Sequence, residues 1–331
     1  MRGFVGALAL LVLGMGLLLG AVTWWPDRPL PLAGASAELS IETGTTPREV
    51  AQAWVDAGVQ THPRLLYEWF RWSGQARRIR AGSYEINAGA TPRTLLAKMV
   101  QGDETLERVR FIEGWTLRQV RAALAEAPHL KPAAAALSDA QLMAALGAPD
   151  LPAEGRFFPD TYVYSRGVSD LTVLRRAHQA MQRRLDQVWA EREPGTPLKT
   201  PAEALILASI VEKETGVGAD RGLVAGVFVN RLRIGMPLQT DPTVIYGLGA
   251  AFDGNLRKRD LLTDTPYNTY TRGGLPPTPI ALPGLASLRA AVRPQPTKAL
   301  FFVARGDGSS VFSENLADHN RAVNKYQRGA P

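Results

Sequence analysis

The chain has 331 residues, of which 45% are apolar and 21% charged, and it carries a formal net charge of +7. This composition is typical of a globular protein with two or three domains and excludes a largely disordered chain. Because the sequence contains no cysteine, a disulfide framework and thiolate catalysis are excluded as well. The four histidines lack the spacing of zinc ligands, so the sequence predicts no metal site and no cofactor.

The first segment of the chain predicts a membrane anchor over residues 1–25. Residues 4–23 contain no charged side chain, and about 20 apolar residues suffice for one helical crossing of a bilayer. Arg2 precedes this stretch and two tryptophans follow it, which favours a single pass with the N-terminus inside and the bulk of the chain outside. A cleaved signal peptide is the alternative, because residues 33–35 are small, although the apolar region of a signal peptide usually has only about 7 to 15 residues.

The basic charge favours anionic partners. For an exported domain these are lipid headgroups or an acidic cell-wall polymer rather than nucleic acid, for which no binding module is present in the sequence. Basic groupings at residues 77–80 and 257–259 contribute to this charge. The alternative is that they are ordinary solvated faces.

Beyond the anchor, a proline-rich stretch over residues 26–37 predicts an extended linker. A short pattern of glycine turn, threonine cap and helix start then occurs three times, each time after a stretch with strand character at 39–42, 84–86 and 109–112. The three copies begin at Gly44, Gly89 and Gly114. With two helices expected within 48–80, residues 38–105 predict a small α+β unit; the alternative is that such turns recur by chance.

Residues 106–331 predict a larger, helix-rich α+β part. Apolar spacing and capping residues predict helices at 117–125, 139–146, 170–192, 201–215, 220–234, 285–292 and 318–326. Strands at 299–303 and 310–312 flank a glycine turn and predict a hairpin. Between Gly235 and Pro283 the chain is dense in proline and glycine and shows no clear element; such loops are usually functional or disordered, and the content of this one argues against disorder.

The helix predicted at 201–215 carries the most informative residue, Glu214. Thr200 and Glu203 have the spacing of a capping box, and Gly216 stands where a left-handed residue would end the helix. Glu214 shares its helix face with apolar residues three, four and seven positions earlier, so its carboxyl group should be desolvated. Desolvation raises the pKa of a carboxyl group and suits a general acid. The alternative is an ordinary ion pair of Glu214 with Lys or Arg.

The long loop is rich in groups that bind sugars. Residues 239–247 and 267–270 combine amides and hydroxyls, which hydrogen-bond to sugar hydroxyls, with aromatic rings, which cover the apolar face of a pyranose. The alternative is that these side chains form turns and core. Two further groups, at 157–162 and at Asn315, His319 and Asn320, either line the same cleft or are structural.

A glycosidase normally needs two carboxylates. Asp241, Asp160 and Glu212 are all candidates for the second one, and the spacing does not decide among them. A single acid would suffice if a nearby sugar hydroxyl served as the nucleophile.

Several long runs resemble a known family: ASIVEKET at 208–215, VFVNRL at 227–232, LQTDPTVIYG at 238–247, YNTY at 267–270 and GLPP at 274–277. They are similar to the YceG-like endolytic murein transglycosylases of bacterial inner membranes. The resemblance implies a single-pass enzyme with a cytoplasmic N-terminus and a periplasmic bulk, a LysM-like module over 38–105 and a catalytic domain over 106–331. Peptidoglycan glycan strands are then the substrate, and a peptidoglycan synthase is a possible partner. The family's catalytic glutamate falls on Glu214.

The predicted reaction is cleavage within nascent glycan strands, between N-acetylmuramic acid and N-acetylglucosamine, giving 1,6-anhydromuramyl ends and terminating elongation. Glu214 is the predicted acid. The residues expected to bind or orient sugar are Asn230, Gln239, Asp241, Tyr246, Tyr267 and Asn268. The alternatives are a muramidase-type hydrolase, a noncatalytic membrane-anchored scaffold that binds peptidoglycan, and a structural membrane protein.

Overall fold

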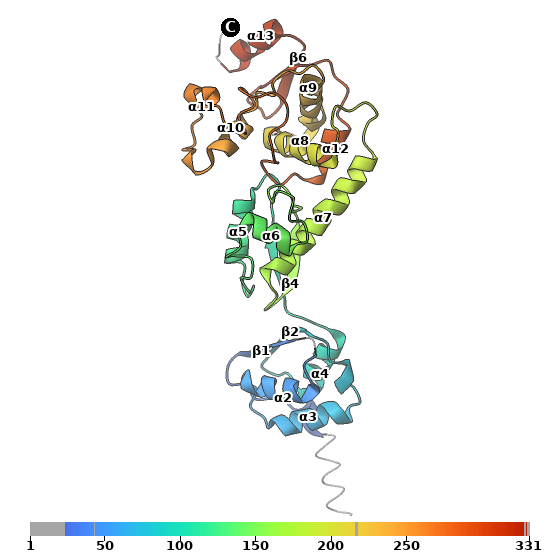
Figure 1. Cartoon of the computed structure of the whole chain (residues 1–331). Coiled ribbons are helices and arrows are strands. Elements are labelled where there is room, and N and C mark those ends of the chain that lie inside the picture. The colour runs from blue at the N-terminus through green and yellow to red at the C-terminus, as the bar shows by residue number, and fades with distance from the viewer. Residues whose placement is uncertain (1–23, 43, 216–217, 328, 330–331) are drawn as a thin grey trace, which may run out of the picture. The chain divides into compact units, whose positions relative to one another are not determined.

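The computed structural model describes residues 24–42, 44–215, 218–327 and 329 (Figure 1). The span predicted at residues 4–23 and the helix stop predicted at Gly216 lie outside the described residues. Within the described part of the chain, no helix combines the length and the apolar character needed to cross a membrane.

The chain divides into two compact units, which we call the N-terminal and the C-terminal unit. The N-terminal unit comprises Met1–Arg108, Pro128–Leu130 and Val163–Val168, and the C-terminal unit comprises Val109–Ala127, Lys131–Tyr162 and Ser169–Pro331. Small two-stranded sheets and many helices make up the described residues, in agreement with the predicted α+β class.

The N-terminal unit is built on one antiparallel strand pair. Strand β1 (Ser36–Ile41) pairs with β2 (Gly82–Asn87) from Ser36 opposite Asn87 to Ile41 opposite Gly82. The helices are α2 (Pro47–Asp56), α3 (Pro63–Trp72) and α4 (Pro92–Gln101), with short 3-10 turns η1 (Trp25–Asp27) and η2 (Ala76–Arg78). Thr46 and Thr91 cap α2 and α4, each followed by proline, as the repeated pattern predicted.

The stretch predicted as an extended linker is packed instead. Leu30 is only 4% exposed and belongs to the core of the N-terminal unit, and its N–H donates to the carbonyl of Ala90 over 2.8 Å. Pro26 and Ala37 are buried too. The linker prediction for residues 26–37 was therefore wrong, because burial of these apolar side chains outweighs the preference of a proline-rich stretch for an extended conformation.

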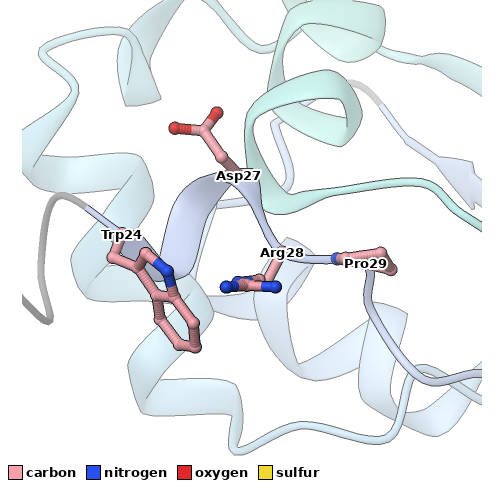
Figure 2. Close-up of a pocket in the computed structure, with 4 residues that line it drawn as sticks. All are labelled: Trp24, Asp27, Arg28 and Pro29. Carbon is pink, nitrogen blue, oxygen red and sulfur yellow. The ribbon is translucent and has the colours of Figure 1, made fainter.

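A shallow hollow lies beside η1 (Figure 2). The guanidinium group of Arg28 stands 3.8 Å from the ring centroid of Trp24, whereas Asp27 points away from both and pairs with Arg93 over 2.6 Å. Both charged side chains at the hollow therefore have a partner: Arg28 contacts an aromatic face, and Asp27 forms an ion pair.

A second two-stranded sheet consists of β3 (Leu106–Arg110) and β4 (Thr161–Ser165). The third copy of the repeated pattern follows β3 and leads into α5 (Leu117–Glu126), as predicted. Strand β4 was not predicted. Only its first two residues, Thr161 and Tyr162, fell in the polar and aromatic run at 157–162, whose two phenylalanines are buried in the core.

The centre of the C-terminal unit is helix α8 (Pro201–Glu214). Every residue from Ala204 to Val211 is buried, because α7 (Asp170–Ala190), α9 (Arg221–Arg233) and α12 (Leu285–Val292) all contact α8 (Figure 1). The helix is therefore apolar on all sides along most of its length. Its polar end is the C-terminal turn that carries Glu212 and Glu214.

The remaining elements surround this core. Helix α6 (Asp139–Ala145) follows α5, and a 3-10 turn η3 (Gly218–Asp220) leads into α9. The chain ends with the predicted hairpin β5 (Phe301–Ala304) and β6 (Ser310–Ser313), which are antiparallel, and with α13 (Leu316–Tyr326). Asp220 was expected to cap α9, but its carboxylate instead accepts a hydrogen bond from the Ser310 N–H over 2.6 Å.

The proline- and glycine-dense segment between Gly235 and Pro283 is not a loop without elements. It contains α10 (Asp241–Leu248), η4 (Gly249–Ala251) and α11 (Lys258–Leu262). These helices are short, and α10 opens with a proline in its first turn and ends at glycine, so composition concealed them.

Candidate active site

A cleft of about 530 Å³ opens at the C-terminal end of α8. Glu214 from α8, Arg231 from α9 and Asp241 from α10 reach this cleft, and the hairpin strand β5 and helix α13 contribute further walls. Elements far apart in the sequence thus meet around the carboxyl group of Glu214.

Glu214 is the last residue of α8 and is half-buried. Its carboxylate accepts a hydrogen bond from the hydroxyl of Thr240. Burial raises the pKa of the Glu214 carboxyl group, and the nearby negative charge of Asp241 raises it further, whereas the Thr240 hydrogen bond and the positive charge of Arg231 lower it. Among the described residues, no basic side chain lies within 4.0 Å of this carboxylate. A hydroxyl group, rather than an ion pair, therefore holds Glu214.

Glu212, two residues earlier on α8, has a different environment. Its side chain is 8% exposed, and its carboxylate accepts the N–H of Gly284 over 2.9 Å and lies 3.8 Å from Arg221. Gly284 is the N-cap residue of α12, so Glu212 satisfies a backbone donor at the start of that helix. Its role is structural, which removes it from the candidates for a second catalytic carboxylate.

Asp241 does reach the cleft and faces Tyr270. The Tyr270 hydroxyl donates to the Asp241 carboxylate over 2.6 Å, and burial together with this hydrogen bond raises the pKa of Tyr270. Asp241 is also the first residue of α10, where the helix dipole favours a negative charge. Asp160, another candidate, is exposed, and its carboxylate accepts the N–H of Thr161, the first residue of β4, over 2.7 Å.

Gln239 lines the same cleft in an unusual backbone conformation, with a φ of 48°. A non-glycine residue in this left-handed region costs on the order of 1 kcal/mol and persists only where neighbours hold it. Here the N–H of Gln239 donates to the carbonyl of Thr269 over 3.1 Å. The exposed side chain is consequently aimed into the cleft from a fixed backbone.

The structure does not bring two of the predicted sugar-binding residues into the cleft. The amide of Asn230 donates to the carbonyls of Thr297 and Ala299, at 2.8 and 3.1 Å. Asn268 is fully buried and donates to three carbonyls between Asp260 and Thr263. Both amides complete backbone hydrogen bonds, so we assign them a structural role in place of the predicted one.

The other two predicted residues, Tyr246 and Tyr267, line a separate cleft of about 450 Å³. Their rings meet edge to face with centroids 4.8 Å apart. The hydroxyl of Tyr246 donates to Glu154 over 3.2 Å, and Glu154 lines this second cleft as well. Of the predicted residues, Gln239 and Asp241 therefore line one cleft of the C-terminal unit and Tyr246 and Tyr267 line the other. In the described part of the chain, no group of three or more acidic or histidine side chains is arranged to hold a metal ion.

Known proteins resemble this chain along most of its length. The sequence profile of the YceG-like family matches residues 39–325. The chain belongs to the YceG-like family.

A protein from Bacillus subtilis (strain 168), named endolytic murein transglycosylase, is 31% identical over 88% of this chain and 85% of its own length. A protein of the same name from Streptococcus pneumoniae (strain D39) is 27% identical over 91% of this chain, which spans 60% of that protein. A crystal structure of a yceG-like protein from Listeria monocytogenes matches with a TM-score of 0.55 at 26% identity, covering 87% of this chain and 98% of that one.

The sequence did not single out several residues around the site of this YceG-like chain. Thr240, Arg231 and Tyr270 all lie within the runs that resemble the family, but no local pattern marks their position in the fold. Arg231 is buried and donates to the carbonyls of Leu238 and Leu300, both at 2.7 Å, so it fixes the cleft wall. His319, left open by the sequence, stacks on Phe301 and lines the cleft.

Proposed function

We propose that this chain is an endolytic murein transglycosylase that cuts nascent peptidoglycan strands. The observation that carries the proposal is the half-buried carboxyl group of Glu214, whose pKa is raised above its usual range where it opens into a cleft. A raised pKa keeps the proton on the acid near neutral pH. The names of the relatives from Bacillus subtilis and Streptococcus pneumoniae support the same activity.

In the proposed reaction, Glu214 donates its proton to the glycosidic oxygen between N-acetylmuramic acid and N-acetylglucosamine. The bond between that oxygen and the anomeric carbon breaks, and N-acetylglucosamine leaves as the alcohol. The 6-hydroxyl of the muramyl unit then closes on the anomeric carbon and gives its proton to the Glu214 carboxylate. The ring closure yields a 1,6-anhydromuramyl end and restores the acid, so no second catalytic carboxylate is required.

The neighbours of Glu214 suit this reaction. The Asp241 carboxylate favours the protonated form of Glu214 and would stabilise the positive charge that develops at the anomeric carbon. The amide of Gln239 would bind sugar hydroxyls beside the cut. The ring faces of Tyr246 and Tyr267 would contact sugar units farther along the strand, in the second cleft. A strand that contacts both clefts would be bound along several sugar units, which suits a cut inside the strand.

The remaining parts of the proposal concern location and partners. Residues 1–25 would anchor the chain in the inner membrane, with a cytoplasmic N-terminus and a periplasmic bulk, which the apolar stretch at 4–23 supports. Residues 38–105 would form a LysM-like module that binds glycan, and the order strand, helix, helix, strand from β1 to β2 supports this. A peptidoglycan synthase is the proposed partner.

Product analysis tests the reaction. Purified full-length protein in detergent is incubated with uncrosslinked glycan strands, and the fragments are identified by mass spectrometry. Internal fragments with 1,6-anhydromuramyl ends are expected. Reducing ends would show a muramidase-type hydrolase, and strands that are bound but remain uncut would show a noncatalytic scaffold.

A further inference from the structure

The second cleft of the C-terminal unit contains a carboxyl group that the proposed reaction does not use. Glu154 lies in the segment between α6 and β4 and is held by three donors. Its Oε1 accepts the N–H of Leu117 over 2.9 Å and the N–H of Gly155 over 3.2 Å, while its Oε2 accepts the hydroxyl of Tyr246 over 3.2 Å. Leu117 is the first residue of α5, and Tyr246 lies on α10. The Glu154 side chain therefore joins the start of one helix to the side of another.

Helix α10 connects this carboxyl group to the proposed acid. Thr240, the N-cap residue of α10, donates to Glu214, and Asp241 at its first position raises the pKa of Glu214. Tyr246 lies on the same helix less than two turns later. We propose that Glu154 is a positioning residue for glycan cleavage, which holds α10 through Tyr246 so that Thr240 and Asp241 keep their places beside Glu214. This inference rests on the proposed function.

A short helix such as α10 needs contacts of this kind. It has only eight residues, and helices of that length are marginal without tertiary contacts. It is bounded on one side by the left-handed Gln239 and on the other by Gly249, with φ of 48° and 55°. The hydroxyl of Thr243 lies 2.9 Å from that of Thr269 and fixes the first turn. The bond from Tyr246 to Glu154 fixes the far half of the helix.

The tether responds to pH. The pKa of Glu154 is raised to about 7, chiefly by burial. The negative charge of Asp139 also raises this pKa, whereas the three hydrogen bonds lower it. The other charged or titratable groups that line this cleft are Arg118, Arg121, Tyr246 and Tyr267. The ionised carboxylate accepts stronger hydrogen bonds than the neutral acid, so the tether tightens as pH rises through about 7.

The test compares three variants of the full-length protein. Tyr246→Phe removes the hydroxyl but keeps the ring, and Glu154→Gln keeps the shape but cannot ionise. Tyr162→Phe is the matched control, because its hydroxyl donates to the Phe158 carbonyl at 2.7 Å and to no residue of α10. Steady-state cleavage of glycan is measured across pH, together with thermal unfolding and hydrogen exchange of the α10 amides without substrate.

We expect Tyr246→Phe to lower kcat on the order of tenfold with little change in KM, because misplaced groups slow the chemical step more than binding. Glu154→Gln should match the wild type at low pH and fall behind as pH rises above about 7, where only the wild type ionises. Hydrogen exchange in α10 should accelerate in both variants, and Tyr162→Phe should keep the wild-type kcat.

Two results would overturn the proposal alone. One is an active wild type whose kcat and pH profile are unchanged in Tyr246→Phe and Glu154→Gln. The other is an equal loss of kcat in Tyr162→Phe, with matching losses of thermal stability, which would mark a general structural effect. A wild-type chain that cuts no glycan would instead sink the proposed function, and this inference with it.

Discussion

The hydroxyl of Thr240 donates a hydrogen bond to the carboxyl group of Glu214, 26 residues away in the sequence. This bond favours the ionised form of Glu214, whereas burial and the charge of Asp241 favour the protonated form. The last residue of α8 and the first turn of α10 therefore jointly set the pH range in which Glu214 holds its proton.

Removal of the Thr240 hydroxyl should extend the activity to higher pH. In Thr240→Val the ionised form of Glu214 loses a donor, so the pKa of Glu214 rises further. Because an acid donates its proton only while protonated, the alkaline limb of the plot of kcat against pH should move to higher pH. Thr240→Ser keeps a hydroxyl and should keep the limb in place. A limb that moves down in Thr240→Val would contradict the assigned role of the bond.

Neutralisation of Asp241 should have the opposite effect. The Asp241 carboxylate raises the pKa of Glu214, so Asp241→Asn lowers that pKa and moves the alkaline limb of kcat to lower pH. Asp150→Asn, at an exposed position of the same unit, is the control for a change of net charge. If both variants shift the limb equally, the effect is not local to the cleft.

Replacement of the proposed acid should abolish cleavage without loss of the fold. Glu214→Gln keeps the size of the side chain but has no carboxyl proton to donate, so kcat should fall by about 10² to 10⁴. Circular dichroism and the thermal midpoint should stay close to those of the wild type, because the amide oxygen still accepts the Thr240 hydroxyl. Wild-type cleavage by the pure variant would exclude Glu214 as the acid.

Glu212 should matter for stability and not for chemistry. Glu212→Ala leaves the Gly284 N–H without its acceptor, and a buried donor without a partner costs about 1 to 3 kcal/mol. Glu212→Gln retains an acceptor oxygen and should cost less. The free energy of unfolding from denaturant titration gives the cost, and kcat per folded molecule should stay unchanged in Glu212→Gln, which keeps the bond. A large loss of kcat in a stably folded Glu212→Gln would give Glu212 a catalytic role.

Local signals in the sequence predicted much of the fold. Thr200 and Pro201 mark the start of α8, and Thr46 and Thr91 cap α2 and α4 where the repeated pattern placed them. Helix α10 was not predicted because glycine and proline surround it. The start of the helix, at Thr240, is fixed by a contact with Thr269, which is distant in the sequence. The packing of Leu30 was missed for a related reason, since its partners come from elsewhere in the chain.

The candidate site was predictable to the extent that it depends on one helix. The position of Glu214 at the end of a buried helix follows from its neighbours in sequence, and so does its desolvation. Thr240 could not be predicted as its partner, because the bond joins two elements. Asn230 has a side chain that is suited to binding sugar, but its amide donates a hydrogen bond to the carbonyl of Thr297, 67 residues away. Only the fold shows this bond.

The bond from Glu212 to the Gly284 N–H fixes the last turn of α8 to the first turn of α12. Glu214 stands on that same turn, so its backbone has little freedom to follow a substrate. If the chain cuts glycan as proposed, the glycan strand moves and the proton donor does not. A linkage is then cut when it lies beside the carboxyl group of Glu214.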